Sequence, residues 1–210
     1  MRRILTASAL LLMALGGPIA GAWAQTTQPD QIEEDWQIVI GTPDATGAGP
    51  QMSTAMSPVS DGSTPFFVFD LNYRDSPTFQ PGGLQAQVWS GDQMLSSSTN
   101  GSQVCNTTGE TITWTQRMKI SSGNVSFAVD SGKSTTWGKF GQGQQLNIGG
   151  SFATSLADLS GYSPATSVAN SGAGWERNRV TSMTLLRVRY YAGGKLLSTD
   201  NTSRSVDLTK

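Results

Sequence analysis

The sequence predicts an all-β domain, built as an antiparallel β-sandwich or jelly roll with one long loop and minimal helix. Roughly ten short segments alternate apolar and polar side chains, which is the period of a half-buried strand. Clusters of Gly, Pro, Asn and Asp separate these segments, and no long segment of helical period follows residue 24. A barrel is the main competitor, but an outer-membrane barrel needs lipid-facing strands of ~10 residues, a length that few segments reach.

The first 24 residues predict a cleavable export signal. Arg2 and Arg3 precede an apolar stretch over residues 4–15, and an A-x-A pattern at residues 22–24 offers the small side chains that signal peptidase needs. The cut is predicted between Ala24 and Gln25. A membrane-spanning helix needs ~20 apolar residues, so we expect a secreted or periplasmic protein with no transmembrane anchor after cleavage.

The mature chain is predicted to begin with a polar tail over residues 25–35, which ends in the acidic run Glu33-Glu34-Asp35. One β-sandwich domain then occupies residues 36–210. Without Arg2 and Arg3 the net charge of −1 becomes about −3, so a nucleic-acid partner is not expected. The sequence has no His, which excludes Ser-His-Asp and Cys-His catalysis.

Alternation and turn residues place the strands in order along the chain. The predicted strands are 36–40, 51–56, 66–74, 84–89, 93–97, 111–120, 125–129, 135–140, 146–148, 151–154, 180–191, 195–199 and 205–208. Gln116 interrupts the apolar face of its strand. Residues 155–178 lack regular alternation, and we interpret them as a structured loop with a short helical turn at 156–159.

Neither a disulfide framework nor a metal or cofactor site is predicted. Cys105 is the single cysteine, so it has no intramolecular partner. We expect a partly buried thiol on a strand or loop, with an intermolecular disulfide as the alternative. No D-x-D-x-D-G calcium loop occurs.

Aromatic and amide side chains outside the core are candidates for binding. A sugar ring presents an apolar face and a rim of hydroxyls, so its site pairs an exposed aromatic ring with polar side chains. One candidate surface is a polar strand face with Asp70, Asn72, Arg74, Gln85, Gln87 and Trp89. The long loop offers Tyr162, Trp175 and Arg179, and Trp137 lies in a polar segment. Trp36 and Trp114 are expected in the core. The alternative for both candidate surfaces is a solvated sheet face or a loop packed over the sandwich.

Charged residues leave two further possibilities open. Glycosidic hydrolysis needs two carboxyl groups, and after the acidic tail the only glutamates are Glu110 and Glu176. Arg187 and Arg189 make the last long strand basic. They would suit an acidic polymer or, alternatively, pair with acids of the same chain.

The stretch from Val125 to Phe140, with the short alternating strands around it, resembles concanavalin-like β-sandwich domains of exported bacterial proteins. The resemblance implies glycan binding or an accessory role, and the missing acidic triad counts against glycanase activity. We therefore expect an exported, non-catalytic protein that binds a glycan or cell-surface polymer. The alternatives are a structural or assembly subunit of the cell envelope and a carboxylate-dependent hydrolase. The oligomeric state stays open.

Overall fold

The computed structural model describes residues 27–42, 50–72, 83–100, 105, 107–136, 138–141 and 150–209, with the side chains of Asn72 and Trp175 left out. The predicted export signal, its cleavage site at Ala24 and Gln25, and the candidate residues Arg74 and Trp137 lie outside this part of the chain.

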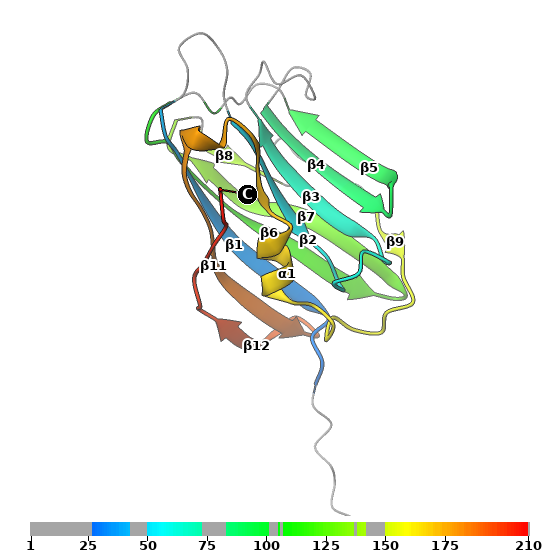
Figure 1. Cartoon of the computed structure of the whole chain (residues 1–210). Helices are drawn as coiled ribbons and strands as arrows, with labels where there is room; N and C mark the ends of the chain where they lie inside the picture. Colours follow the sequence, from blue (N-terminus) through cyan, green and yellow to red (C-terminus); the bar gives the residue numbers. More distant parts are fainter. Residues whose placement is uncertain are drawn as a thin grey trace, which may run out of the picture.

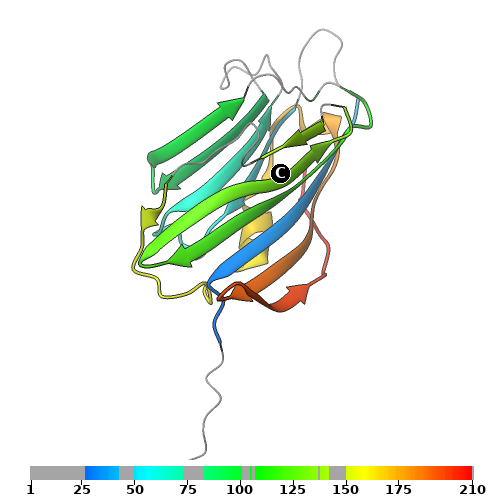
Figure 2. The same ribbon diagram turned by 180° about the vertical axis from the view of Figure 1, so that it is seen from behind.

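Two antiparallel sheets form the molecule, with the five-stranded sheet in front in Figure 1 and the eight-stranded sheet in front in Figure 2. The eight-stranded sheet has the order β12 (Lys195–Asp200), β11 (Val180–Ala192), β1 (Gln31–Ile40), β6 (Thr111–Ser121), β7 (Asn124–Ser134) and β8 (Gly138–Phe140), with β13 (Arg204–Ser205) on β11 and β9 (Phe152–Ala153) on β7. The five-stranded sheet has the order β10 (Gly172–Trp175), β2 (Gln51–Met56), β3 (Phe66–Asn72), β4 (Gly83–Ser90) and β5 (Gln93–Asn100). The prediction of an antiparallel β-sandwich is confirmed, whereas the jelly-roll variant stays a prediction.

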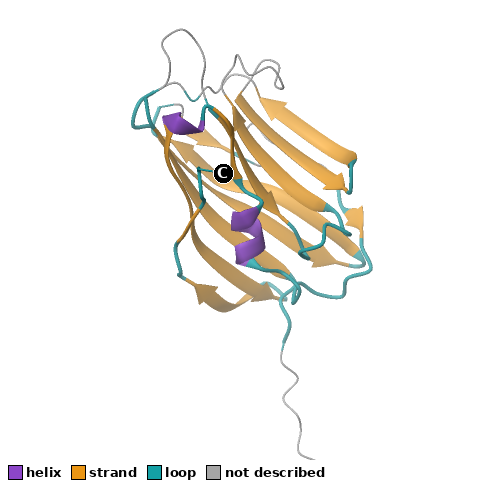
Figure 3. Ribbon diagram, viewed as in Figure 1, coloured by secondary structure: helices purple, strands orange, loops and turns teal. Residues whose placement is uncertain are grey.

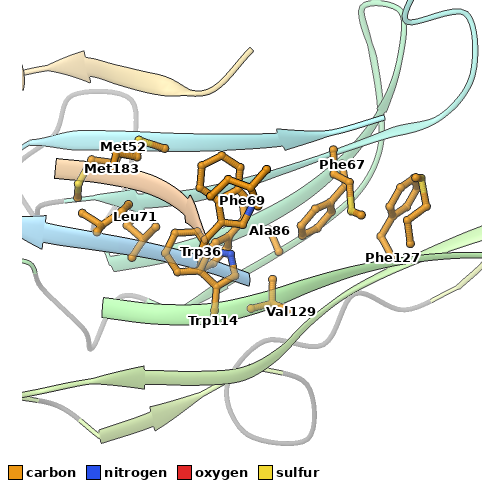
Figure 4. Packing of buried hydrophobic residues seen from close by; sticks show 14 of the residues in the cluster. Trp36, Met52, Phe67, Phe69, Leu71, Ala86, Trp114, Phe127, Val129 and Met183 are labelled. Atoms are coloured by element: carbon orange, nitrogen blue, oxygen red, sulfur yellow. The ribbon is translucent and has the colours of Figure 1, made fainter. Parts of the chain in front are cut away.

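Aromatic side chains from both sheets meet in the core (Figure 4). Phe67 of β3 stacks on Phe127 of β7, with ring centroids 5.7 Å apart. Phe69, two residues further along, meets Trp114 of β6 edge-on at 5.1 Å, and Trp114 stacks on Trp36 of β1 at 6.4 Å. Because successive side chains of a strand point to opposite faces, the same alternation that fills this core leaves a second set of side chains on each outer surface.

Strand β1 begins earlier than the sequence predicts. Residues 31–35, predicted as part of a polar tail, belong to the strand Gln31–Ile40. The charged run alternates between faces, so Glu34 points inward while Glu33 and Asp35 point outward. The outward carboxylates meet Arg189 of β11, whose guanidinium lies 2.9 Å from a Glu33 oxygen and 2.6 Å from an Asp35 oxygen. Charge pairing across the strands therefore holds an acidic segment in a sheet.

The predicted long loop contains one short helix, α1 (Pro164–Ala169), and the edge strand β10 (Figure 3). The helical turn predicted at residues 156–159 is wrong. The helix begins instead at Pro164, a residue whose fixed φ suits the first helical position. Helix α1 lies beside β2, where the backbone N–H of Ala55 donates to the Ser171 hydroxyl at 3.1 Å.

Candidate functional site

The described residues of the predicted polar strand face form one surface, because β3 and β4 pair in the register that it requires. Asp70 lies opposite Gln85, and Phe66 lies opposite Trp89. Since Phe67, Phe69 and Leu71 fill the core, these partners lie on the outer face of the five-stranded sheet. The sequence pattern identifies the residues of this face but not the pairing of the two strands.

Two pockets that share Phe66 and Val68 occupy this outer face, and we call them together the sheet groove. The first, of about 420 Å³, lies between β2, α1 and the 57–62 turn. The second, of about 460 Å³, reaches across β3 and β4. The residues that line the second pocket are Gln51, Phe66, Val68, Asp70, Gln85, Gln87 and Trp89. Both volumes fall within the range of small-ligand sites.

An aromatic pair forms one end of the second pocket. Trp89 is partly buried, and its indole N–H donates to the Gln87 amide oxygen at 3.0 Å. This hydrogen bond fixes the Gln87 amide so that its NH₂ group is the end left for a ligand. The ring faces of Trp89 and of Phe66, directly across the strand pair, then offer apolar surface next to amide groups.

Asp70 provides the acidic group of the same pocket. Its side chain is only 5% exposed, and the Ser53 hydroxyl of β2 donates a hydrogen bond to it. Burial raises the pKa of Asp70 to about 6, against the hydrogen bond from Ser53, which lowers it. Burial disfavours a charge without an opposite partner, so this carboxylate is suited to accept hydrogen bonds or a positive charge from a ligand.

Two residues of the predicted loop site, Tyr162 and Arg179, are not among the described residues that line this groove. Tyr162 is 8% exposed, and its hydroxyl donates to Glu34 at 2.5 Å inside the sandwich, so the expectation of a ligand contact there is wrong. Arg179 forms an ion pair with Glu176 at 3.0 Å in the short 3-10 turn Arg177–Arg179. Arg187 pairs with Asp35 on the outer face of the eight-stranded sheet, which agrees with the intramolecular alternative for the basic strand.

A buried polar network lies between the sheets, and sequence reasoning missed it. Glu34 is fully buried and accepts hydrogen bonds from the Trp36 indole at 2.8 Å and the Gln116 amide at 2.7 Å. The Gln116 oxygen in turn accepts one from the Thr54 hydroxyl of β2 at 2.8 Å, so the network joins the two sheets. Burial raises the pKa of Glu34, although hydrogen bonds from Ser167, Tyr162 and others oppose this. The one sign of this network in the sequence is Gln116, a polar residue that interrupts the apolar face of its strand.

Two of the residues that motivated other chemistry, Glu110 and Cys105, are buried. Glu110 is 1% exposed and accepts hydrogen bonds from Ser134 and Thr136, so it lends no support to a hydrolase. Cys105 is also 1% exposed, and burial raises the pKa of its thiol, as does the neighbouring charge of Glu110. A thiol in this position is not placed to form an intermolecular disulfide.

Among the described residues, no group of three or more Cys, Asp or Glu side chains is arranged to hold a metal ion. No helix of that part of the chain is long and apolar enough to cross a membrane. Comparison with known proteins finds no matching family, and no curated protein or solved structure resembles the chain significantly.

Proposed function

We propose that this chain is an exported, non-catalytic protein whose sheet groove binds a glycan or another cell-surface polymer, with glycan as the favoured class. The observation that carries the proposal is the pairing of Phe66 with Trp89 in the same pocket as Gln87 and Asp70. Aromatic rings contact the apolar face of a sugar, while amide and carboxylate groups bind its hydroxyls.

The size of the pocket favours a chain of sugars over a single ring. Phe66 and Asp70 are four residues apart on β3, which corresponds to about 13 Å along a strand. The aromatic and acidic ends of the pocket would therefore contact different rings of an oligosaccharide. Export is an independent part of the proposal and rests on the predicted signal at residues 1–24.

A glycan array with purified protein tests the proposal, followed by titration of the best oligosaccharide against variants. Trp89→Ala removes the larger ring of the pocket and should weaken binding about tenfold. Leu196→Ala is the matched control, because Leu196 is a large exposed side chain on β12, which belongs to the other sheet. The absence of any glycan bound above background would refute the proposal.

The exposed edge of β5 favours the second candidate, a structural or assembly subunit of the cell envelope. Among the described strands β5 pairs only with β4, it carries no charged residue, and Met94 and Leu95 are exposed on it. Such an edge can add a further strand from another chain. Light scattering of the protein and of Leu95→Lys tests this candidate, and a monomer in both samples at all concentrations would reject it.

A further inference from the structure

Two charged side chains line the sheet groove among the residues that the structure describes, and both are carboxylates. Asp70 lies in the second pocket, and Asp61 lines the first, at the far side of the shared residues Phe66 and Val68. No Lys or Arg is among the described residues that line either pocket. As far as its described lining goes, the groove therefore combines two acidic side chains with neutral groups.

Within the described part of the chain, no cation compensates the charge of Asp70. Its hydrogen-bond donor among the described residues is the neutral Ser53 hydroxyl, and its side chain is more than nine-tenths buried. On the outer face of the other sheet, by contrast, Asp35 pairs with Arg189 and Asp130 pairs with Arg117. A buried carboxylate gains the most from a ligand that supplies the missing positive charge.

We infer that the sheet groove selects glycans that carry primary amines, with the ammonium group of one amino sugar against the Asp70 carboxylate and the ring of another sugar unit of the same chain on Phe66 and Trp89. This inference rests on the proposed function, since it names the class of glycan bound at the same site. A second ammonium group along the same oligosaccharide would be attracted by Asp61 at the other pocket. Acidic polysaccharides are disfavoured, because both carboxylates would repel them.

Three oligosaccharides that differ at a single substituent test the inference. β-1,4-Linked oligomers of glucosamine, N-acetylglucosamine and glucose have the same ring and linkage, and only the first carries an amine. Calorimetric titration of the purified protein at about pH 6.5 and low salt should show the glucosamine oligomer bound about tenfold more tightly than either of the others. Added salt should reduce this preference, since part of it is an interaction between charges.

Asp70→Asn keeps the size of the side chain and removes its charge. It should abolish the preference for the amine while leaving the affinity for the neutral oligomers within about threefold. Asp92→Asn is the matched control, because Asp92 is an exposed residue of the turn between β4 and β5 and does not line either pocket. Circular dichroism checks that both variants are folded, and Asp61→Asn gives a second variant in the first pocket.

The outcomes separate this inference from the proposed function. Equal affinity for the three oligomers would overturn the selection of amines but leave glycan binding intact. Binding of none of them, together with a negative glycan array, would refute both. An oligolysine peptide that binds as tightly as the glucosamine oligomer, and that is insensitive to Trp89→Ala, would overturn the inference by showing that charge alone determines binding.

Discussion

Replacement of Glu34 by Leu should cost a large share of the stability of the domain. The substitution removes the acceptor of four buried donors, namely the Trp36 indole, the Gln116 amide and the hydroxyls of Tyr162 and Ser167. A buried donor left without a partner costs about 1–3 kcal/mol, so we expect a loss of about 5 kcal/mol in the free energy of unfolding. The total free energy of unfolding of a domain is ~5–15 kcal/mol.

Urea denaturation at neutral pH, followed by tryptophan fluorescence, measures this loss. Glu34→Gln is the matched variant, because an amide keeps the volume and one acceptor oxygen, and its loss should stay below about 2 kcal/mol. Replacing a buried charged group together with all its partners can leave the stability unchanged or even increase it. Here the hydrogen-bond donors remain, so this compensation does not apply. If the Leu variant proved as stable as the Gln variant, the network would not stabilise the fold as argued.

The pH dependence of the Gln variant tests the protonation of Glu34. Burial raises the pKa of Glu34 above its usual value, despite the four donors that favour the carboxylate. A raised pKa contributes stability that is present below the unfolded pKa of ~4.3 and is lost as the pH rises toward the folded value. Relative to the wild type, the Gln variant should therefore become more stable as the pH increases from about 4 to about 8. A change in the opposite direction would show that the hydrogen bonds outweigh burial.

Three further predictions concern other parts of the sandwich. Gly141→Ala should lower the free energy of unfolding by more than about 2 kcal/mol, because its φ is +116° and the new Cβ would lie 2.6 Å from a backbone oxygen of β7. The control Gly123→Ala, at a φ of +72° in open space, should lower it by only about 1 kcal/mol. Equal losses of the two variants in denaturation would contradict this. Arg189→Met should destabilise the protein by about 2 kcal/mol at pH 7. Burial raises the pKa of Asp35, but hydrogen bonds from the arginines and from a threonine lower it overall, so the effect should shrink as the pH falls below about 4; an unchanged effect at pH 3 would refute the pairing. The Cys105 thiol should react with a maleimide at the rate of unfolding, because it is buried, and rapid labelling of the native protein would show otherwise.

The strands and the face that forms the groove can be predicted because their signals are local. Alternation within the segment that forms β3 is enough to place Phe69 on one face and Asp70 on the other. The register of β3 on β4 does not follow from alternation, even though the two strands are neighbours in sequence. The shape of the groove is not predictable from such signals, because α1 and the 57–62 turn enclose it from separate parts of the chain.

The buried network cannot be predicted in this way because its partners are far apart in sequence. Glu34 and Gln116 are separated by 82 positions, and Tyr162 lies 128 positions from Glu34. Taken singly, an acidic residue near the N-terminus, such as Glu34, indicates a polar tail. A glutamine such as Gln116 indicates an interruption of the apolar face of its strand, and a tyrosine in a loop, such as Tyr162, indicates a surface contact. Each of these interpretations is reversed when the three side chains satisfy one another in the core.

The network also explains how the groove keeps its shape. Helix α1 has six residues, and an isolated helix shorter than ~12 residues is marginal in water, so tertiary contacts must hold it in place. Ser167 provides such a contact, since its hydroxyl bonds to Glu34 inside the sandwich while the residue also lines the first pocket with Thr166 and Asn170. The buried Glu34 carboxylate thereby holds α1, which forms one wall of the groove, in its position. Glu34 therefore has a structural role despite the cost of its burial, because an apolar side chain at position 34 would leave α1 without the hydrogen bond from Ser167 that fixes the helix.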